Sequence, residues 1–294
     1  MAENKQPRER DAHSGVETTG HEWDGIKELN NPAPRWWLWV FYITVIFSIG
    51  YWVVYPAWPV PGGATKGAWN WSQQGEMRQG QAEIAGMRAK YLPRFDAASL
   101  EQIRGDAELY EFARVGGGVA FRDNCAACHG TGAVGGKGYP NLNDDDWLWG
   151  GKIDDIYATL RYGIRSGHGQ ARENQMAAYG RDGLLPAADI GAVAEYVVHL
   201  REGDTVTAQP QFEQGKKVFA ENCAACHGEK GEGIPSMGAP RLSDAIWLYG
   251  GTKEAVMATL NNGRGGVMPA WEGRLDDRTI KMLAIYVHGL GGGQ

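Results

Sequence analysis

The sequence predicts an all-α fold, with one apolar helix near the N-terminus followed by two related helical domains of small size. Two observations lead to this prediction. Twenty residues from Trp36 to Tyr55, WWLWVFYITVIFSIGYWVVY, contain no charged side chain. Beyond about residue 108 the chain repeats itself, and few of its segments have the alternating pattern of a strand. The 294-residue chain is therefore divided into segments before any of them is assigned a role.

The apolar run predicts a single transmembrane helix over residues 36–55. At about 1.5 Å of rise per residue, a helix of this length crosses a hydrocarbon core of about 30 Å. A secretory signal peptide would have a shorter apolar region with a small-residue cleavage site after it. Trp and Tyr residues gather at both ends of the run, as expected at the two membrane interfaces. Lys27 and Arg35 precede the run and only Lys66 follows closely, which favours a cytoplasmic N-terminus.

The segments on either side of this helix look less regular. Residues 1–35 are polar and too poor in apolar residues to fold alone, so we expect a mostly disordered cytoplasmic tail. Residues 56–107 begin with a stretch rich in Pro and Gly and continue with helical spacing, which predicts a periplasmic linker with short helices. Two alternatives remain for these helices: they dock on the globular part or on a partner, or they form a loose spacer.

The repeat divides the rest of the chain into two homologous domains, predicted at residues 108–205 and 206–294. NCAACHG begins at Asn124 and again at Asn222, and WLWGG from Trp147 is echoed by WLYGG one hundred residues later. Each repeat ends in an apolar pattern at three-and-four spacing, which predicts a closing helix. Self-similarity of this kind indicates that both domains carry the same type of site.

Each repeat contains a Cys-x-x-Cys-His run, a motif typical of c-type haem attachment. Two thiols one helical turn apart can bond to the two vinyl groups of one porphyrin, and the adjacent imidazole then faces the iron. A zinc site would need two further ligands for each Cys pair, and a redox dithiol would not need the His twice. The motif therefore predicts two covalently attached haem c groups. Their attachment residues and proximal histidines are Cys125, Cys128 and His129 in the first repeat, and Cys223, Cys226 and His227 in the second.

The sixth iron ligand decides whether a haem transfers electrons or binds small molecules, because a Met thioether closes the site and raises the potential. In the second repeat Met268 lies between the ATL segment and the last helix, and we predict it as the partner of His227. In the first repeat Met176 is predicted as the partner of His129. His168 is the competing ligand there, but it has no counterpart in the repeat, whereas Met176 and Met268 share an M-x-A-aromatic pattern followed closely by Gly.

Charge excludes one class of partner. A formal net charge of −6, with no Lys/Arg-rich stripe, argues against nucleic acid. The first domain is the more acidic of the two, and we hypothesise that Asp144, Asp145 and Asp146 form an acidic face that steers a basic donor protein. A solvated loop without this role is the alternative.

The two repeats resemble class I cytochromes c, so the predicted fold is one transmembrane helix followed by two tandem class I cytochrome c domains. In that family a Pro carbonyl accepts the second N–H of the proximal His, and Pro140 and Pro240 stand at the matching places. In the same family the first and last helices cross closely, with a Gly of the first helix against an aromatic residue of the last. The matching pairs within each repeat are Gly117 with Tyr196 and Gly215 with Tyr286.

Nearly the whole chain resembles the FixP/CcoP family, the dihaem subunit of cbb3-type cytochrome c oxidases. The resemblance rests on the order of parts: a polar tail, a PRWW entry to a single anchor, a linker, and two Cys-x-x-Cys-His domains ending in MAAYG and MPAWEG. One departure is Ala177 after Met176, where the family usually has Pro, as at Pro269 in this chain.

This resemblance implies an electron-transfer subunit of a terminal oxidase in aerobic respiration. A donor cytochrome c would reduce one haem, and electrons would pass toward a monohaem c-type subunit and the haem-copper catalytic subunit. Oxygen reduction would occur in that other subunit, so this chain would be non-catalytic. The implied location is the bacterial inner membrane, with a single pass through the lipid bilayer, a cytoplasmic N-terminus and periplasmic haem domains.

Two other classes of protein compete with this interpretation. The first is a free-standing membrane-anchored dihaem electron carrier, or the haem subunit of a periplasmic dehydrogenase. The second is a dihaem peroxidase, which needs one iron open to peroxide, and two well-placed Met residues argue against it. Since fold alone does not fix function, the oxidase prediction depends on the family resemblance.

Overall fold

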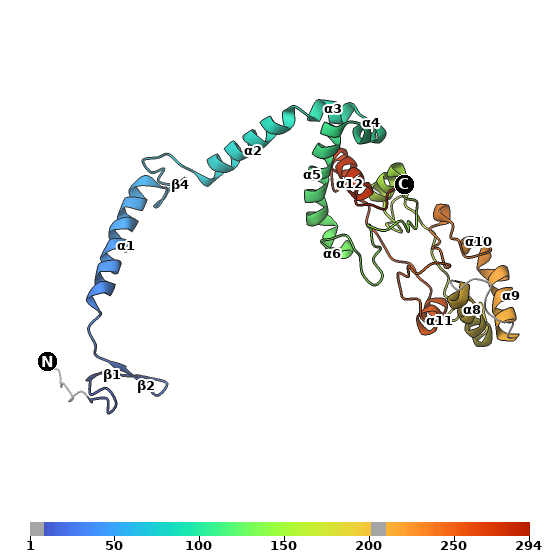
Figure 1. The fold of residues 1–294 in the computed structure, drawn as a ribbon. Helices are drawn as coiled ribbons and strands as arrows, with labels where there is room; N and C mark the ends of the chain where they lie inside the picture. Colours follow the sequence, from blue (N-terminus) through green and yellow to red (C-terminus); the bar gives the residue numbers. More distant parts are fainter. Residues whose placement is uncertain (1–8, 201–209) are drawn as a thin grey trace. The chain divides into compact units, whose positions relative to one another are not determined.

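The structure, a computed structural model, describes residues 9–200 and 210–294 (Figure 1). It divides into two units, residues 1–87 and 88–294. Helices make up most of the regular structure in the described ranges, and the strands there form two short antiparallel pairs. This agrees with the predicted all-α class.

A β-hairpin occupies the segment before the apolar helix. Its strands are β1 (Thr18–Trp23) and β2 (Ile26–Leu29), joined by Asp24 and Gly25, which both have positive φ. An Asp-Gly pair suits the two central positions of a hairpin turn. The predicted disorder of residues 1–35 is therefore wrong from residue 9 onward, because this local turn signal outweighs the polar composition. The first eight residues lie outside the described ranges.

The apolar helix α1 spans Arg35–Val54, within one residue of the predicted boundaries. Its mean hydropathy is 1.8 and none of its apolar window is buried. Among the described helices it is the one long and apolar enough to cross a membrane. The following segment contains a two-residue strand pair, β3 (Pro59–Val60) and β4 (Gly63–Ala64), and then returns to the helix end, where Trp69 donates to the carbonyl of Val54.

Three helices follow in the predicted linker. Helix α2 (Gln73–Ala89) buries no side chain, whereas α3 (Leu92–Ala97) and α4 (Leu100–Gly105) bury Phe95, Leu100 and Ile103 in the globular core. A capping box begins α4: the Ser99 hydroxyl accepts from the Gln102 N–H, and the Gln102 side chain accepts from the Ser99 N–H. Of the two alternatives for this linker, docking on the globular part holds for α3 and α4. The first of the two predicted domains therefore has a core that begins before residue 108.

The remaining helices follow the order of the two repeats. Those of the first repeat are α5 (Ala107–Asn124), α6 (Ala126–His129), α7 (Ile153–Tyr162) and α8 (Ala187–His199). Those of the second are α9 (Pro210–Asn222), α10 (Ala224–His227), the 3₁₀ turn η2 (Pro235–Met237), α11 (Lys253–Asn262) and α12 (Asp277–His288).

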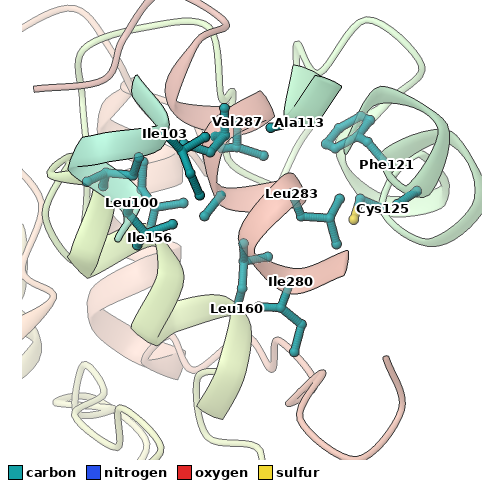
Figure 2. Close-up of a cluster of buried hydrophobic side chains, with 14 of the residues drawn as sticks. Leu100, Ile103, Ala113, Phe121, Cys125, Ile156, Leu160, Ile280, Leu283 and Val287 are labelled. Atoms are coloured by element: carbon teal, nitrogen blue, oxygen red, sulfur yellow. The ribbon is translucent and has the colours of Figure 1, made fainter. Parts of the chain in front are cut away.

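The two repeats exchange their closing helices. Helix α12 packs on α5 and α7, and α8 packs on α9 and α11 (Figure 1). We call the α3–α5, α7 and α12 core the first lobe and the α8, α9 and α11 core the second lobe. Figure 2 shows Ile280, Leu283 and Val287 of α12 among side chains of the first lobe. The boundaries at 108–205 and 206–294 stay predictions for the sequence repeat, but each core combines both repeats.

The exchange overturns the predicted helix crossings within each repeat. A Cβ at Gly117 would lie 2.2 Å from the Met282 carbonyl oxygen and 2.7 Å from Cβ of Tyr286, not beside Tyr196. A Cβ at Gly215 would lie 2.8 Å from Cβ of Tyr196. The residue types were predicted correctly and the partners were not, because the closing helix of each repeat lies on the other repeat's first helix.

Gly117→Ala is expected to destabilise the first lobe, since its methyl group would be forced against the backbone of α12. Overpacking of this kind typically costs about 1–3 kcal/mol in the free energy of unfolding. Denaturant unfolding of the detergent-solubilised chain measures it. Gly191→Ala is the matched control, because a Cβ there meets nothing within 4 Å and Ala is the better helix former. Equal stability of the two variants would contradict the close crossing.

Candidate haem attachment sites

Both Cys-x-x-Cys-His motifs form one helical turn that follows directly on a longer helix. In the first lobe Cys125 ends α5, its N–H donates to the Phe121 carbonyl, and α6 ends at Gly130 with φ of 79°. The second lobe repeats this at Cys223 and Gly228, where φ is 82°. A Gly at the end of each turn is required, since this backbone conformation is unfavourable for other residues. Local sequence therefore builds the same turn twice.

The first cysteine of each motif is buried. Cys125 is 8% exposed and Cys223 is 7% exposed. Burial, the main cause, raises the pKa of each thiol to about 11. Over the described residues, no group of three or more His, Cys, Asp or Glu side chains is placed to hold a metal ion, whereas a structural zinc site takes four such ligands. The surroundings of each motif therefore fit attachment to a porphyrin better than zinc ligation by sulfur.

The histidine of each motif is held by a proline carbonyl. Nδ1 of His129 lies 3.0 Å from the Pro140 carbonyl oxygen, and Nδ1 of His227 lies 2.9 Å from that of Pro240. When Nδ1–H donates to this oxygen, the lone pair of Nε2 remains free for iron. Burial lowers the pKa of His227, which further favours the neutral imidazole that a metal requires. Both expected proline contacts are confirmed.

The loops that carry the predicted methionines are exchanged together with the closing helices. Met268 forms two backbone hydrogen bonds with Ile164 at the end of α7, of 2.9 and 3.0 Å. Met176 forms the matching pair with Arg264 at the end of α11, of 3.0 and 3.1 Å. A Cβ at Gly163 would lie 2.4 Å from the Met268 carbonyl oxygen, so the loop approaches this glycine closely.

The structure therefore brings each methionine to the motif of the other repeat. Met268 packs against the core that contains Cys125, and Met176 packs against the core that contains Cys223. The predicted pairs Met176 with His129 and Met268 with His227 are wrong as spatial pairs. The physical reason is that the methionine loop and the closing helix of each repeat lie on the other repeat. No local signal in the motifs distinguishes an exchanged from an unexchanged pair of repeats.

A cavity of about 1030 Å³ lies at the second motif. It is large enough for a cofactor, since ligand cavities commonly measure about 300–1,000 Å³. Met176, Cys226 and His227 all line it. His168 does not line it: its ring stacks on Tyr162, and its Nε2 lies 3.3 Å from the Glu272 carboxylate. Met176, and not His168, therefore shares this cavity with a motif histidine.

Aromatic residues of the WLWGG and WLYGG loops connect the two lobes, which sequence reasoning missed. A Cβ at Gly238 would lie 2.2 Å from the Trp149 ring, and one at Gly138 would lie 3.4 Å from the Tyr249 ring. These glycines stand two residues before the prolines that hold the proximal histidines. The repeated aromatic residue was visible in the sequence, but its contact with the other repeat depends on the exchange.

The acidic segment of the first repeat is less open than the steering hypothesis assumes. Asp144 and Asp146 are partly buried near Asp244 of the second repeat, and Asp145 is exposed. Burial, then the charges of Asp244 and Asp144, raise the pKa of Asp146 to about 6. Steering of a donor by this segment stays a prediction.

The raised pKa of Asp146 predicts a stability change with pH. The folded chain keeps this proton between the ordinary pKa of 3.8 and about 6, so the free energy of unfolding falls as pH rises through that window. Asp146→Asn is expected to flatten this part of the profile and to raise the denaturant midpoint at neutral pH. Asp145→Asn is the control, with little change expected. A profile of Asp146→Asn that matches the unmodified chain would contradict the buried carboxyl.

Taken together, the turns, the fixed imidazoles and the methionines packed on the same cores suit a haem better than zinc or a redox dithiol. The class of protein that they define is a tandem c-type cytochrome behind an apolar N-terminal helix. Two family models match the chain. One describes the N-terminal domain of cytochrome oxidase-cbb3, FixP, over residues 15–61, and the other the cbb3-type cytochrome c oxidase subunit III, over residues 115–197 and 210–287.

Characterised relatives are similar over almost their whole length. The chain is 53% identical to the cbb3-type cytochrome c oxidase subunit FixP of Bradyrhizobium sp. (strain ORS 278), over 97% of this chain and 98% of the relative. It is 51% identical to subunit CcoP of Azospirillum brasilense, over 98% and 99%. The chain belongs to the FixP/CcoP family of cbb3-type cytochrome c oxidase subunits. This confirms the predicted family, its cytochrome c domains and its role in electron transfer.

Proposed function

We propose that each lobe holds one covalently attached haem c with exchanged axial ligands. The observation that carries this is the pairing of each methionine loop with the lobe of the other repeat. The haem supplies one-electron redox chemistry when it is bound. The proposed sets are Cys125, Cys128, His129 and Met268 in the first lobe, and Cys223, Cys226, His227 and Met176 in the second.

The protein's own groups prepare these sites for electron transfer and not for ligand binding. The carbonyls of Pro140 and Pro240 orient the imidazoles and fix their tautomer, which raises their basicity as ligands. The thioethers of Met268 and Met176 would hold the iron together with the histidines, would keep small molecules from it and would favour the reduced state. Because the lobes belong to one compact unit, electrons can pass from one site to the other without dissociation of the domains.

In this proposal the chain is the electron-entry subunit of an oxidase in aerobic respiration. A donor cytochrome c reduces one lobe, and electrons leave toward the monohaem c-type subunit and the haem-copper catalytic subunit, where oxygen is reduced. Helix α1 anchors the chain once in the bacterial inner membrane, with a cytoplasmic N-terminus and periplasmic lobes. The positive charges before α1 and the periplasmic attachment of haem c in bacteria support this orientation.

Purification from membranes in mild detergent, with a tag on this chain, tests the proposed assembly. Co-elution of b-type haem, copper and oxygen-consuming activity is expected. If c-type haem alone elutes under conditions that preserve known respiratory complexes, the chain is instead a free-standing carrier. A parallel purification from membranes in which this chain carries no tag should recover no copper, which controls for non-specific carry-over.

A further inference from the structure

Arg165 stands at an unusual backbone position between the two methionine loops. It lies just after α7 with φ of 50°, in the left-handed backbone region that residues other than Gly rarely adopt. The equivalent position after α11 is Gly265, which does not have a positive φ. The left-handed conformation of Arg165 indicates that surrounding contacts hold it there, and such residues gather at functional sites.

The guanidinium of Arg165 contacts both methionine loops. Its Nε donates to the carbonyl of Gly266 at 2.7 Å, and Gly266 stands two residues before Met268. Its Nη1 donates to the carbonyl of Asn174, which stands two residues before Met176. The planar guanidinium has several donors in fixed geometry, so a single side chain holds two backbones at once. Lys in its place would keep the positive charge but would lack the planar arrangement of several donors.

Arg165 forms no close ion pair with a carboxylate among the described residues. Over the described residues, no carboxylate lies within 4.0 Å of its guanidinium, unlike Arg161 or Arg172. Burial lowers the pKa of Arg165, and this effect outweighs the attraction of Tyr249 and Glu173. The side chain lines the same cavity as Met176 and His227. The wall of this cavity therefore carries a partly desolvated cation near the second motif.

We propose that Arg165 is a positioning residue for both methionine loops and that its charge raises the reduction potential of the haem held by His227 and Met176. This inference rests on the proposed function. Oxidised haem iron carries one more positive charge than reduced iron, so a nearby cation favours the reduced form. The cavity is also lined by other charged groups, namely Lys137, Asp144, Asp146, Arg241 and Arg264.

The experiment is a potentiometric titration of the full-length dihaem protein, with the iron-methionine charge-transfer absorption recorded for each haem. In Arg165→Gln the reduction equilibrium constant of the second-lobe haem is expected to fall roughly tenfold, which equals about 59 mV for one electron. Arg165→Lys is expected to keep most of the potential but, like Gln, to weaken the methionine absorption of both haems. Arg181→Gln is the control, since Arg181 is exposed and pairs with its neighbour Asp182.

Each outcome decides one part of the proposal. An unchanged potential in Arg165→Gln would overturn the electrostatic role, and unchanged methionine absorption in both variants would overturn the positioning role. Met176→Ala separates these results from the proposed function. If Met176→Ala leaves the second-lobe haem unchanged, the axial assignment is wrong; if it alters that haem while Arg165→Gln does not, only the inference about Arg165 fails.

Discussion

Met268→Ala is expected to remove the sixth ligand of the haem attached at Cys125 and Cys128, although Met268 belongs to the other repeat. Its loop is hydrogen-bonded to Ile164 and its side chain packs in the first lobe. Loss of the thioether should lower the reduction potential of that haem strongly, by roughly 100 mV or more, because axial ligands set haem potentials over about 0.8 V. The haem attached at Cys223 should keep its own methionine.

Single-haem backgrounds make this prediction sharp. In a chain with Cys223→Ala and Cys226→Ala, the remaining haem belongs to the first lobe. In that background Met268→Ala should abolish the iron-methionine absorption, and Met176→Ala should leave it intact. The reverse result, with Met176→Ala abolishing the absorption, would mean that each repeat supplies both of its own ligands and would contradict the exchange.

The sequence predicted the residue types at both sites but not their spatial partners. Local rules were sufficient for the one-turn Cys-x-x-Cys-His motifs, for α1, and for the prolines that accept from the histidines. These features depend on neighbours within a few residues or on a family pattern. Pairing Met176 with His129 instead depended on the assumption that a repeat folds on itself.

That assumption could not be tested from one chain, because both repeats present the same surfaces. Gly117 and Gly215 each accept an aromatic residue on a closing helix, and Tyr196 and Tyr286 are interchangeable in kind. The two arrangements bury equivalent side chains, so apolar patterns do not distinguish them. Only the helix contacts of the assembled fold show which arrangement the chain adopts.

The hairpin before α1 and the docking of α3 and α4 are different cases. The Asp24-Gly25 turn signal was present in the sequence. Disorder was predicted for residues 1–35 because that prediction depended on their polar composition and not on the turn signal. For α3, Phe95 packs on Phe112 of α5 and belongs to a core completed by α12, which is distant in sequence. Propensity alone therefore left two alternatives for that linker.

A chain truncated after residue 205 is expected to lose the folded first lobe, even though it retains the whole first repeat. The truncation removes α12, and with it four nearly inaccessible side chains of the first lobe: Ile280, Leu283, Ile285 and Val287. Burial of such side chains contributes about 1.5–3 kcal/mol each, or roughly 6–12 kcal/mol together. This matches the total stability of a typical domain, about 5–15 kcal/mol. Helix α8 would at the same time lose α9 and α11.

The test compares the truncated chain with the full-length chain by limited proteolysis and by the protection of α5 from hydrogen exchange. The truncated chain should be cleaved rapidly within α5 and α7, where the full-length chain is resistant. Co-expression of residues 206–294 as a separate polypeptide is the control, and it should restore protection because it supplies α12 and α9 in trans. A truncated chain that folds and binds haem unaided, with α8 on α5, would show that the repeats are independent domains. Restoration by the separate second repeat would instead establish that neither lobe is complete without residues from both.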